Sequence, residues 1–200
     1  FSPGLSSVPA NMDPIMTAAE FERFSGRSGM PLDDITAWIA VGQQAADDYT
    51  GRTLGYGAMA EKLVMRGSVA LLHSYPVDEN EPVTVKVDGE TVAEDRYFLS
   101  HKDGLLYLDR ASESDAVVEV EYHGGYKTAD VPAPIKVACA MIANAMLTKR
   151  DSGGQQILSE KLDGYAVAYV QQFGGTGLES VAPAAAALLR PYAHKAGVAV

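Results

Sequence analysis

The chain has 200 residues, which predicts one domain with an insertion or with tails. Its 26 acidic and 16 basic residues give a net charge of -10, which argues against a protein that grips phosphates, because nucleic-acid affinity comes from Lys and Arg. The single cysteine, Cys139, excludes an intrachain disulfide and favours assembly in the cytoplasm. The Ser-, Pro- and Gly-containing start, residues 1–16, predicts a flexible N-terminal arm, and nowhere do about 18 uncharged apolar residues run together as a membrane helix requires.

Two helices are expected first. Thr17 precedes Glu20 by the capping-box spacing, which predicts a helix over residues 17–25. A longer helix over residues 32–50 follows, with apolar residues at helical spacing, acidic residues in its first turn and Gly51 as its stop. Small residues at Gly42 and Ala46 would let another helix approach closely.

The apolar period changes to two between residues 61 and 122, which predicts an antiparallel β region inserted between helices. Six strands are expected, separated in part by Gly67-Ser68, Asp88-Gly89 and Asp103-Gly104, dipeptides typical of hairpin turns. A third long helix is predicted over residues 134–150, then a short strand near 165–170 and a final Ala-rich helix over about 183–195. The expected fold class is therefore α+β, with a core of about four helices and a β insertion between the second and third long helical segments.

No residue pattern indicates catalysis, a metal or a cofactor. The four histidines are scattered, and none has a His or Cys at the spacing of a helical zinc site. The acidic pairs Asp33-Asp34, Asp47-Asp48 and Asp78-Glu79 are better explained as solvated polar faces than as a metal site, because two of them lie on a predicted helix whose other face is apolar. We therefore expect no enzymatic activity, no cofactor and no bound metal. Aromatic and apolar residues on the predicted elements are expected to anchor the core, namely Trp38, Tyr49, Tyr122, Tyr126 and Ile142.

Several short motifs in chain order resemble the head-tail connector (adaptor) proteins of tailed bacteriophages. They are Tyr49-Thr50-Gly51-Arg52 at a helix end, Tyr75-Pro76-Val77 before a strand, Tyr122-His123-Gly124-Gly125-Tyr126 before Pro-x-x-Ile-Lys, and Ser159-Glu160-Lys161-Leu162-Asp163-Gly164-Tyr165. The resemblance covers residues 17–192 and implies a structural virion protein of the neck. In that family, subunits form a dodecameric ring under the portal protein, carry the stopper or tail protein below, and let DNA pass through the lumen without sequence-specific binding. An acidic lumen would not slow a passing duplex.

Residues 17–173 are accordingly expected to form the connector domain, and residues 174–200 a C-terminal docking arm. Gly174, Gly175 and Gly177 predict a joint, and the helix after them has few large apolar residues to hold it on the domain. The expected portal-binding residues are Leu188, Leu189, Arg190 and Tyr192, with a terminal helix packed on its own core as the alternative. A β-rich receptor- or carbohydrate-binding module is the alternative for the whole chain.

Overall fold

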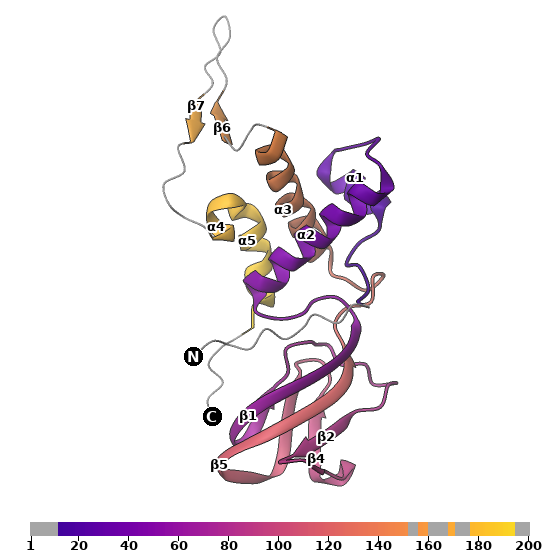
Figure 1. The fold of residues 1–200 in the computed structure, drawn as a ribbon, viewed down its shortest axis with the longest axis vertical. Helices are drawn as coiled ribbons and strands as arrows, with labels where there is room; N and C mark the ends of the chain where they lie inside the picture. Colours follow the sequence, from indigo (N-terminus) through magenta and orange to yellow (C-terminus); the bar gives the residue numbers. More distant parts are fainter. Residues whose placement is uncertain (1–11, 152–155, 160–167, 171–176, 195–200) are drawn as a thin grey trace, which may run out of the picture. The chain divides into compact units, whose positions relative to one another are not determined.

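The computed structural model describes residues 12–151, 156–159, 168–170 and 177–194. These residues form two compact units, which Figure 1 shows as a helical part and a β part. The β unit is built from Thr50–Val131, joined by residues 12–15 and 193–194, and the helical unit from Met16–Tyr49 and Pro132–Tyr192. The α+β class, with an antiparallel β region between helices, is confirmed.

The helical unit contains α1 (Ala18–Ser25), α2 (Leu32–Thr50), α3 (Ala133–Asp151), α4 (Leu178–Val181), α5 (Pro183–Leu189) and the 3₁₀ turn η2 (Arg190–Tyr192). The predicted capping box is present: the Thr17 hydroxyl accepts from the Glu20 amide, and the Glu20 carboxylate accepts from the Thr17 amide. Gly51 follows α2 with φ of 67°, the left-handed conformation that ends a helix.

The close helix approach predicted at Gly42 is also confirmed. A Cβ atom at Gly42 would lie 2.5 Å from the Cys139 carbonyl oxygen, so only glycine lets α2 pass α3 at this point. Around the crossing, Ile39, Ala46, Ala143 and Leu147 are buried. Burial also raises the pKa of the Cys139 thiol, so this cysteine is a packing residue.

The β unit is one twisted antiparallel sheet in the order β1-β5-β2-β3, with β4 pairing the first half of β5. Its strands are β1 (Gly57–Leu71), β2 (Thr84–Val87), β3 (Glu90–Thr91), β4 (Tyr97–Ser100) and β5 (Leu105–Gly124), with a 3₁₀ turn η1 (Glu94–Arg96) before β4. The two long strands β1 and β5 pair from Gly57 opposite Gly124 to Leu71 opposite Leu105 (Figure 1).

One expected hairpin is wrong. Gly67-Ser68 does not reverse the chain but lies inside the continuous strand β1, where the pairing with β5 shifts register. Gly67 has a positive φ of 82°. Both a β-bulge and a tight turn favour glycine at such a position, so the sequence could not distinguish a bulge from a hairpin turn here. The turns at Asp88-Gly89 and Asp103-Gly104 are confirmed, because both connect neighbouring antiparallel strands.

A separate two-stranded ladder joins β6 (Gln156–Ser159) to β7 (Ala168–Val170). The short strand expected near residues 165–170 is present in its last three residues, whereas β6 was not expected. The motif Ser159 to Tyr165 and the joint Gly174–Gly175 lie almost wholly outside the described residues. No helix within the described ranges is long and apolar enough to cross a membrane.

Residues near both ends of the described part of the chain are buried. Ile15 and Met16 are 0% and 1% exposed, so the last residues of the expected N-terminal arm are fixed by burial, while residues 1–11 lie outside the described part. At the other end α5 packs on α3 and buries Ala185, Ala186 and Leu189. Alanines suffice here because they let two helices approach closely, and the described C-terminal helices therefore belong to the helical unit.

Candidate functional site

The first three motifs come together around Arg52 in the β unit. Arg52 follows the positive-φ Gly51 and is 5% exposed. Its Cζ atom lies 3.3 Å from the centre of the Tyr75 ring and 5.6 Å from that of Tyr126. Its Nη2 atom also donates to the Tyr75 carbonyl oxygen. One buried cation thus ties together the helix end, the Tyr-Pro-Val segment and the Tyr-x-Gly-Gly-Tyr segment.

The two glycines of Tyr-x-Gly-Gly-Tyr are required by close backbone approach. A Cβ at Gly124 would lie 2.6 Å from the Ser74 carbonyl oxygen, and one at Gly125 would lie 2.2 Å from that of Gly55. Gly125 also has φ of 95°. Its amide donates to the Pro76 carbonyl over 3.0 Å, and the Tyr126 amide donates to the Leu54 carbonyl over 2.8 Å. The motif is therefore a backbone junction of three chain segments.

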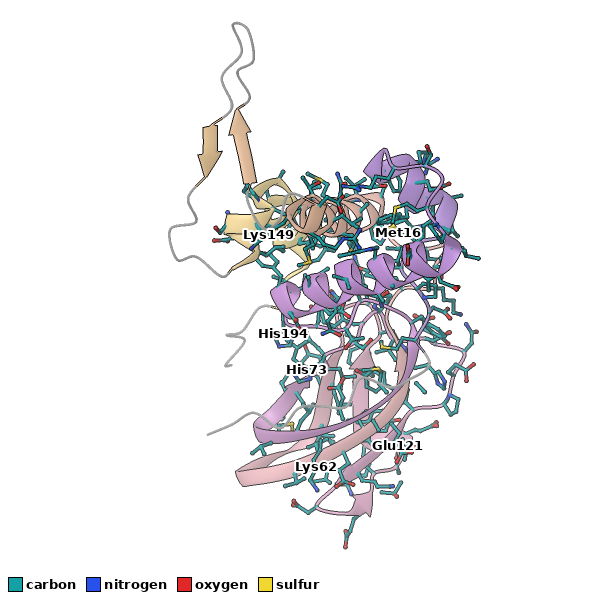
Figure 2. All side chains as sticks on the ribbon, turned by 45° about the horizontal axis from the view of Figure 1, so that its top comes forward. Met16, Lys62, His73, Glu121, Lys149 and His194 are labelled. Carbon is teal, nitrogen blue, oxygen red and sulfur yellow. The ribbon has the colours of Figure 1, made fainter. Side chains whose placement is uncertain are left out.

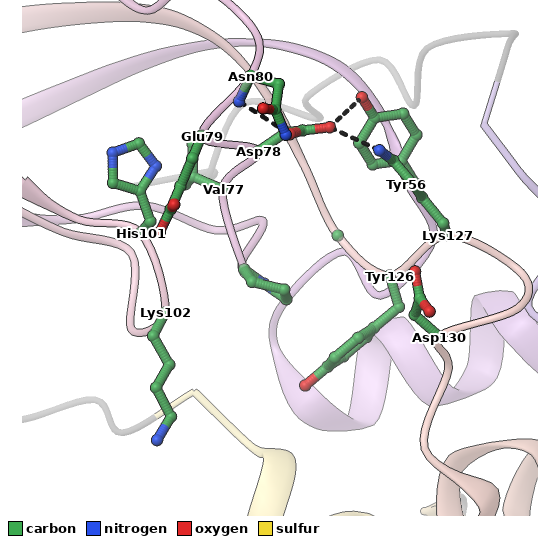
Figure 3. A pocket seen from close by; sticks show the side chains of 12 residues that line it. Tyr56, Val77, Asp78, Glu79, Asn80, His101, Lys102, Tyr126, Lys127 and Asp130 are labelled. Atoms are coloured by element: carbon green, nitrogen blue, oxygen red, sulfur yellow. Dashed lines mark hydrogen bonds and ion pairs between the residues drawn. The ribbon is translucent and has the colours of Figure 1, made fainter.

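A hydrogen-bonded carboxylate, Asp78, lies beside this junction (Figure 3). Its Oδ2 atom accepts from the Tyr56 hydroxyl over 2.9 Å and lies 2.8 Å from Lys127 Nζ. Its Oδ1 atom accepts from the Asn80 amide over 3.0 Å. The Lys127 ammonium, followed by these hydrogen bonds, holds the pKa of Asp78 far below its usual range, and Asp78 in turn raises the pKa of Lys127. This carboxylate is fully partnered, so it is suited to fixing the loop rather than to proton transfer.

A second carboxylate, Glu61 on β1, accepts several hydrogen bonds within the β unit. Its side chain is 7% exposed, and its oxygens accept from the His73 backbone amide over 3.0 and 3.1 Å and from the Tyr122 hydroxyl. Its Oε2 atom also lies 2.8 Å from His73 Nδ1, and this hydrogen bond raises the pKa of His73. Burial together with the Glu61 charge raises the pKa of Tyr122 well above its usual value, so Tyr122 stays a neutral donor.

The His73 ring stacks on His194, with centroids 5.3 Å apart and planes within 5° (Figure 2). The His194 backbone amide donates to the Thr50 carbonyl over 2.6 Å, and its Cβ lies 3.5 Å from the position of a Cβ on Gly51. Burial lowers the pKa of His194, as do the nearby charges of His73 and Arg52. The chain is thereby attached to the β unit after η2.

A cleft of about 360 Å³ opens beside Asp78 (Figure 3). Its walls come from four segments of the chain and include Pro76, His101, Lys102, Tyr126, Lys127 and Asp130. No serine, cysteine or threonine lines it, and within the described ranges no group of three His, Cys, Asp or Glu side chains could hold a metal ion. The arrangement offers mixed charges and aromatic edges, which suits contact with another protein chain.

The residues expected to bind the portal differ in accessibility. Arg190 is exposed and lies 3.7 Å from Glu179, Leu188 and Tyr192 are half-buried, and Leu189 is 0% exposed within the helical unit. Leu189 is thus enclosed by its own unit, in which α5 packs on α3. Leu188, Arg190 and Tyr192 keep surface that a partner could contact.

The expected core anchors also divide into two groups. Ile142 and Tyr122 are 0% and 3% exposed. Trp38, Tyr49 and Tyr126 are half-buried, because each reaches a polar or charged partner at the edge of its unit. These partners are Arg150 above the Trp38 ring at 5.3 Å, Glu179 Oε1 at 3.2 Å from the Tyr49 hydroxyl, and Arg52 near Tyr126.

Comparison with solved structures connects this geometry to a known fold. One chain in a structure described as the neck of an empty gene transfer agent particle, computed with C6 symmetry, matches with a TM-score of 0.55 and 13% identity, covering 98% of this chain and 96% of its own. This chain has the fold of that neck component. A chain in the virion of a native gene transfer agent particle matches with a TM-score of 0.53 and 16% identity, covering 96% of each chain. No family model and no curated protein matches.

The neck-type fold covers both the helical and the β unit, so it includes the motif junction around Arg52. The resemblance to head-tail connectors is confirmed at the level of fold. Glu61 was the residue that sequence reasoning missed most clearly: a lone glutamate on a strand resembles a solvent-facing residue, and only the pairing of β1 with β5 brings it to the Tyr122 hydroxyl.

Proposed function

We propose that this chain is a structural virion protein, a head-to-tail adaptor whose copies form a ring under the portal and connect the capsid to the tail. The observation that carries the proposal is the match of nearly the whole chain to a neck component of a gene transfer agent particle. Because the match spans both the helical and the β unit, it favours a neck role over a separate receptor- or carbohydrate-binding β module. No enzymatic activity is part of the proposal.

Side-by-side subunits would make the ring, with DNA passing through its lumen. A net charge of -10 suits such a passage, because an acidic wall does not hold phosphates. Exposed apolar side chains on the β unit, Phe98 at 65% and Tyr107 at 38%, pair across β4 and β5 with ring centroids 5.9 Å apart. We expect this pair to lie in the contact between neighbouring copies, together with polar helix faces. Each contact can be weak, because a subunit already held by the portal raises the effective concentration of the next.

The portal contact is proposed to use the exposed surface of Leu188, Arg190 and Tyr192, and a stopper or tail protein would bind elsewhere on the ring. Arg190 suits an acidic partner surface, and its ion pair with Glu179 is exposed and therefore weak. Truncation of the whole C-terminal segment is a poor test, since α5 packs on α3 and its loss would unfold the helical unit.

Co-sedimentation with the portal protein of the same particle tests the proposal. The wild-type chain should sediment with the portal, and Arg190→Glu should weaken that binding at least about tenfold without changing the melting temperature. Arg96→Glu, an exposed reversal on η1, is the matched control and should bind like wild type. Failure of the wild-type chain to bind its own portal would overturn the adaptor role, whereas equal binding of Arg190→Glu would remove only the assigned contact.

A further inference from the structure

The two ends of the β sheet are formed by strands of very different length. β1 lies at one end of the sheet order, and no described segment other than β5 forms a backbone hydrogen bond with Gly57–Leu71. The short strands β3 and β4, of two and four residues, lie on the opposite side of β5. β1 thus presents a row of amide and carbonyl groups over 15 residues, longer than the edge strands that proteins usually leave open.

The exposed side chains of β1 carry one cation and one large apolar group. The exposed residues in the described part of this strand are Ala58, Ala60, Lys62 and Val64, which share one face because they alternate along the strand. Val64 is 71% exposed. The Lys62 ammonium lies 2.8 Å from Glu119, yet its side chain is 67% exposed, and with three N–H donors it can bind a further carboxylate.

The opposite end of the sheet carries the complementary groups. Glu90 on β3 and both Glu94 and Asp95 on η1 are exposed, and none of these three carboxylates forms an ion pair with any residue that the structure describes. Phe98 on the adjoining β4 is 65% exposed. Each end of the sheet therefore presents one large apolar side chain, with a cation at one end and three carboxylates at the other.

A second copy of this chain supplies the matching surface for each end. A contact between two β1 edges would bring two surfaces with the same Lys62 cation together, whereas β1 against the β3–β4 end joins opposite charges. Because these two ends are different surfaces, their contact is head to tail and leaves each copy with one end free for the next. Repetition of such a contact by a fixed rotation closes a ring.

We propose that the β1 edge of one copy binds the β3–β4 end of the next copy. Lys62 faces the carboxylates of Glu90, Glu94 and Asp95, and Val64 lies beside Phe98. This pairing rests on the proposed ring and names the two surfaces that meet between its neighbouring subunits. It covers the open edge together with Val64 and Phe98, the two most exposed large apolar side chains in the described part of the β unit.

Cysteine cross-linking tests this pairing, with the portal protein and with the chain alone at high concentration. Val64→Cys and Phe98→Cys are made singly and together and treated with a short bis-maleimide; native Cys139 is buried and should not react. The double variant should give a ladder of covalent dimers, trimers and larger species, because each copy then carries a cysteine at both ends. Each single variant should remain monomeric on a denaturing gel.

A link within one chain cannot produce this result. β5 lies between β1 and β4, and the residues opposite Val64 and Phe98, which are Val117 and Tyr107, are roughly 30 Å apart along it. Covalent dimers of Val64→Cys alone would overturn the pairing in favour of a two-fold contact between β1 edges. Absence of a ladder in both preparations would also overturn it, while portal binding by the wild-type chain would leave the adaptor role standing. A ladder from a chain that does not bind its portal would keep the pairing and remove the adaptor role.

Exchange of the charges gives a second test in the double-cysteine background. Lys62→Glu should lower the yield of the ladder at least about threefold, and addition of Glu90→Lys with Glu94→Lys should restore it. Lys86→Glu is the matched control and should not lower the yield: Lys86 also lies opposite Glu119, but it has β3 and β5 on its two sides. An unchanged yield with Lys62→Glu, or a loss that the reversed carboxylates do not restore, would contradict the pairing.

Discussion

The Cζ atom of Arg52 lies 3.3 Å from the centre of the Tyr75 ring, and the same guanidinium donates to the Tyr75 carbonyl. This buried contact joins the end of α2 to the segment before β2. Its counterpart on the surface is Arg150, whose Cζ lies 5.3 Å from the Trp38 ring while its side chain is 63% exposed.

We expect Arg52→Met to lower the free energy of unfolding by about 2–3 kcal/mol, because it leaves a buried carbonyl without its charged donor. Arg150→Met should lower it by less than about 1 kcal/mol, since its contact is exposed. Urea titration of both variants measures the difference. Equal losses would show that burial of Arg52 contributes nothing.

Gly125→Ala should be more damaging. The new Cβ would meet the Gly55 carbonyl oxygen at 2.2 Å, at a residue with φ of 95°. We expect a loss above about 3 kcal/mol, or failure to fold, because both the overlap and the backbone strain must be relieved. Gly89→Ala is the matched control: its φ is 88° but no atom lies within 4 Å of the new Cβ, so strain alone should lower stability by about 1 kcal/mol. Similar losses in the two variants would contradict the close approach.

The sequence was informative where a local rule decides the structure. The Thr17 capping box, the glycine after α2 and the small residue at Gly42 all act through nearby backbone, so their patterns predicted α1, the end of α2 and the close approach of another helix at Gly42. The hairpin turn predicted at Gly67-Ser68 was wrong because glycine with a positive φ fits a β-bulge and a turn equally well. The resemblance to head-tail connectors identified the motif segments that meet around Arg52. Neither the motifs nor the periodicity indicated that Arg52 is buried near Tyr75 and Tyr126, or that Glu61 accepts a hydrogen bond from Tyr122.

Trp38 shows the limit of a helical stripe as a measure of burial. The spacing placed it on the apolar face of α2, yet it is half-buried with Arg150 above its ring. Trp38→Ala should therefore lower the free energy of unfolding by about 1–2 kcal/mol, less than the roughly 3–5 kcal/mol of an enclosed aromatic. Ile142→Ala, at a residue 0% exposed, should lose about 3–4 kcal/mol. Thermal or urea unfolding of both variants compares them, and a larger loss at Trp38 would reverse this ranking.

The stacked histidines should impose opposite pH dependences. The Glu61 hydrogen bond raises the pKa of His73, so its contribution is fully present below the unfolded value of about 6.5 and is lost as pH rises through the folded pKa. Burial lowers the pKa of His194, so its contribution is present above about 6.5 and is lost as pH falls through the folded pKa.

We accordingly expect His73→Gln to lose more stability at pH 5.5 than at pH 8.5, and His194→Gln to lose more at pH 8.5 than at pH 5.5. Urea midpoints of the two variants and of wild type at both pH values test these opposite pH dependences. Parallel pH profiles for the two variants would show that the ring contact does not titrate as described.

Electron microscopy of the chain with the portal protein of its own particle tests the adaptor role most directly. We expect a closed ring of copies seated on the portal, with density for both the helical and the β unit repeated around one axis and an open lumen. Particles of bare portal beside free single chains, under conditions where portal and chain are both folded, would contradict it.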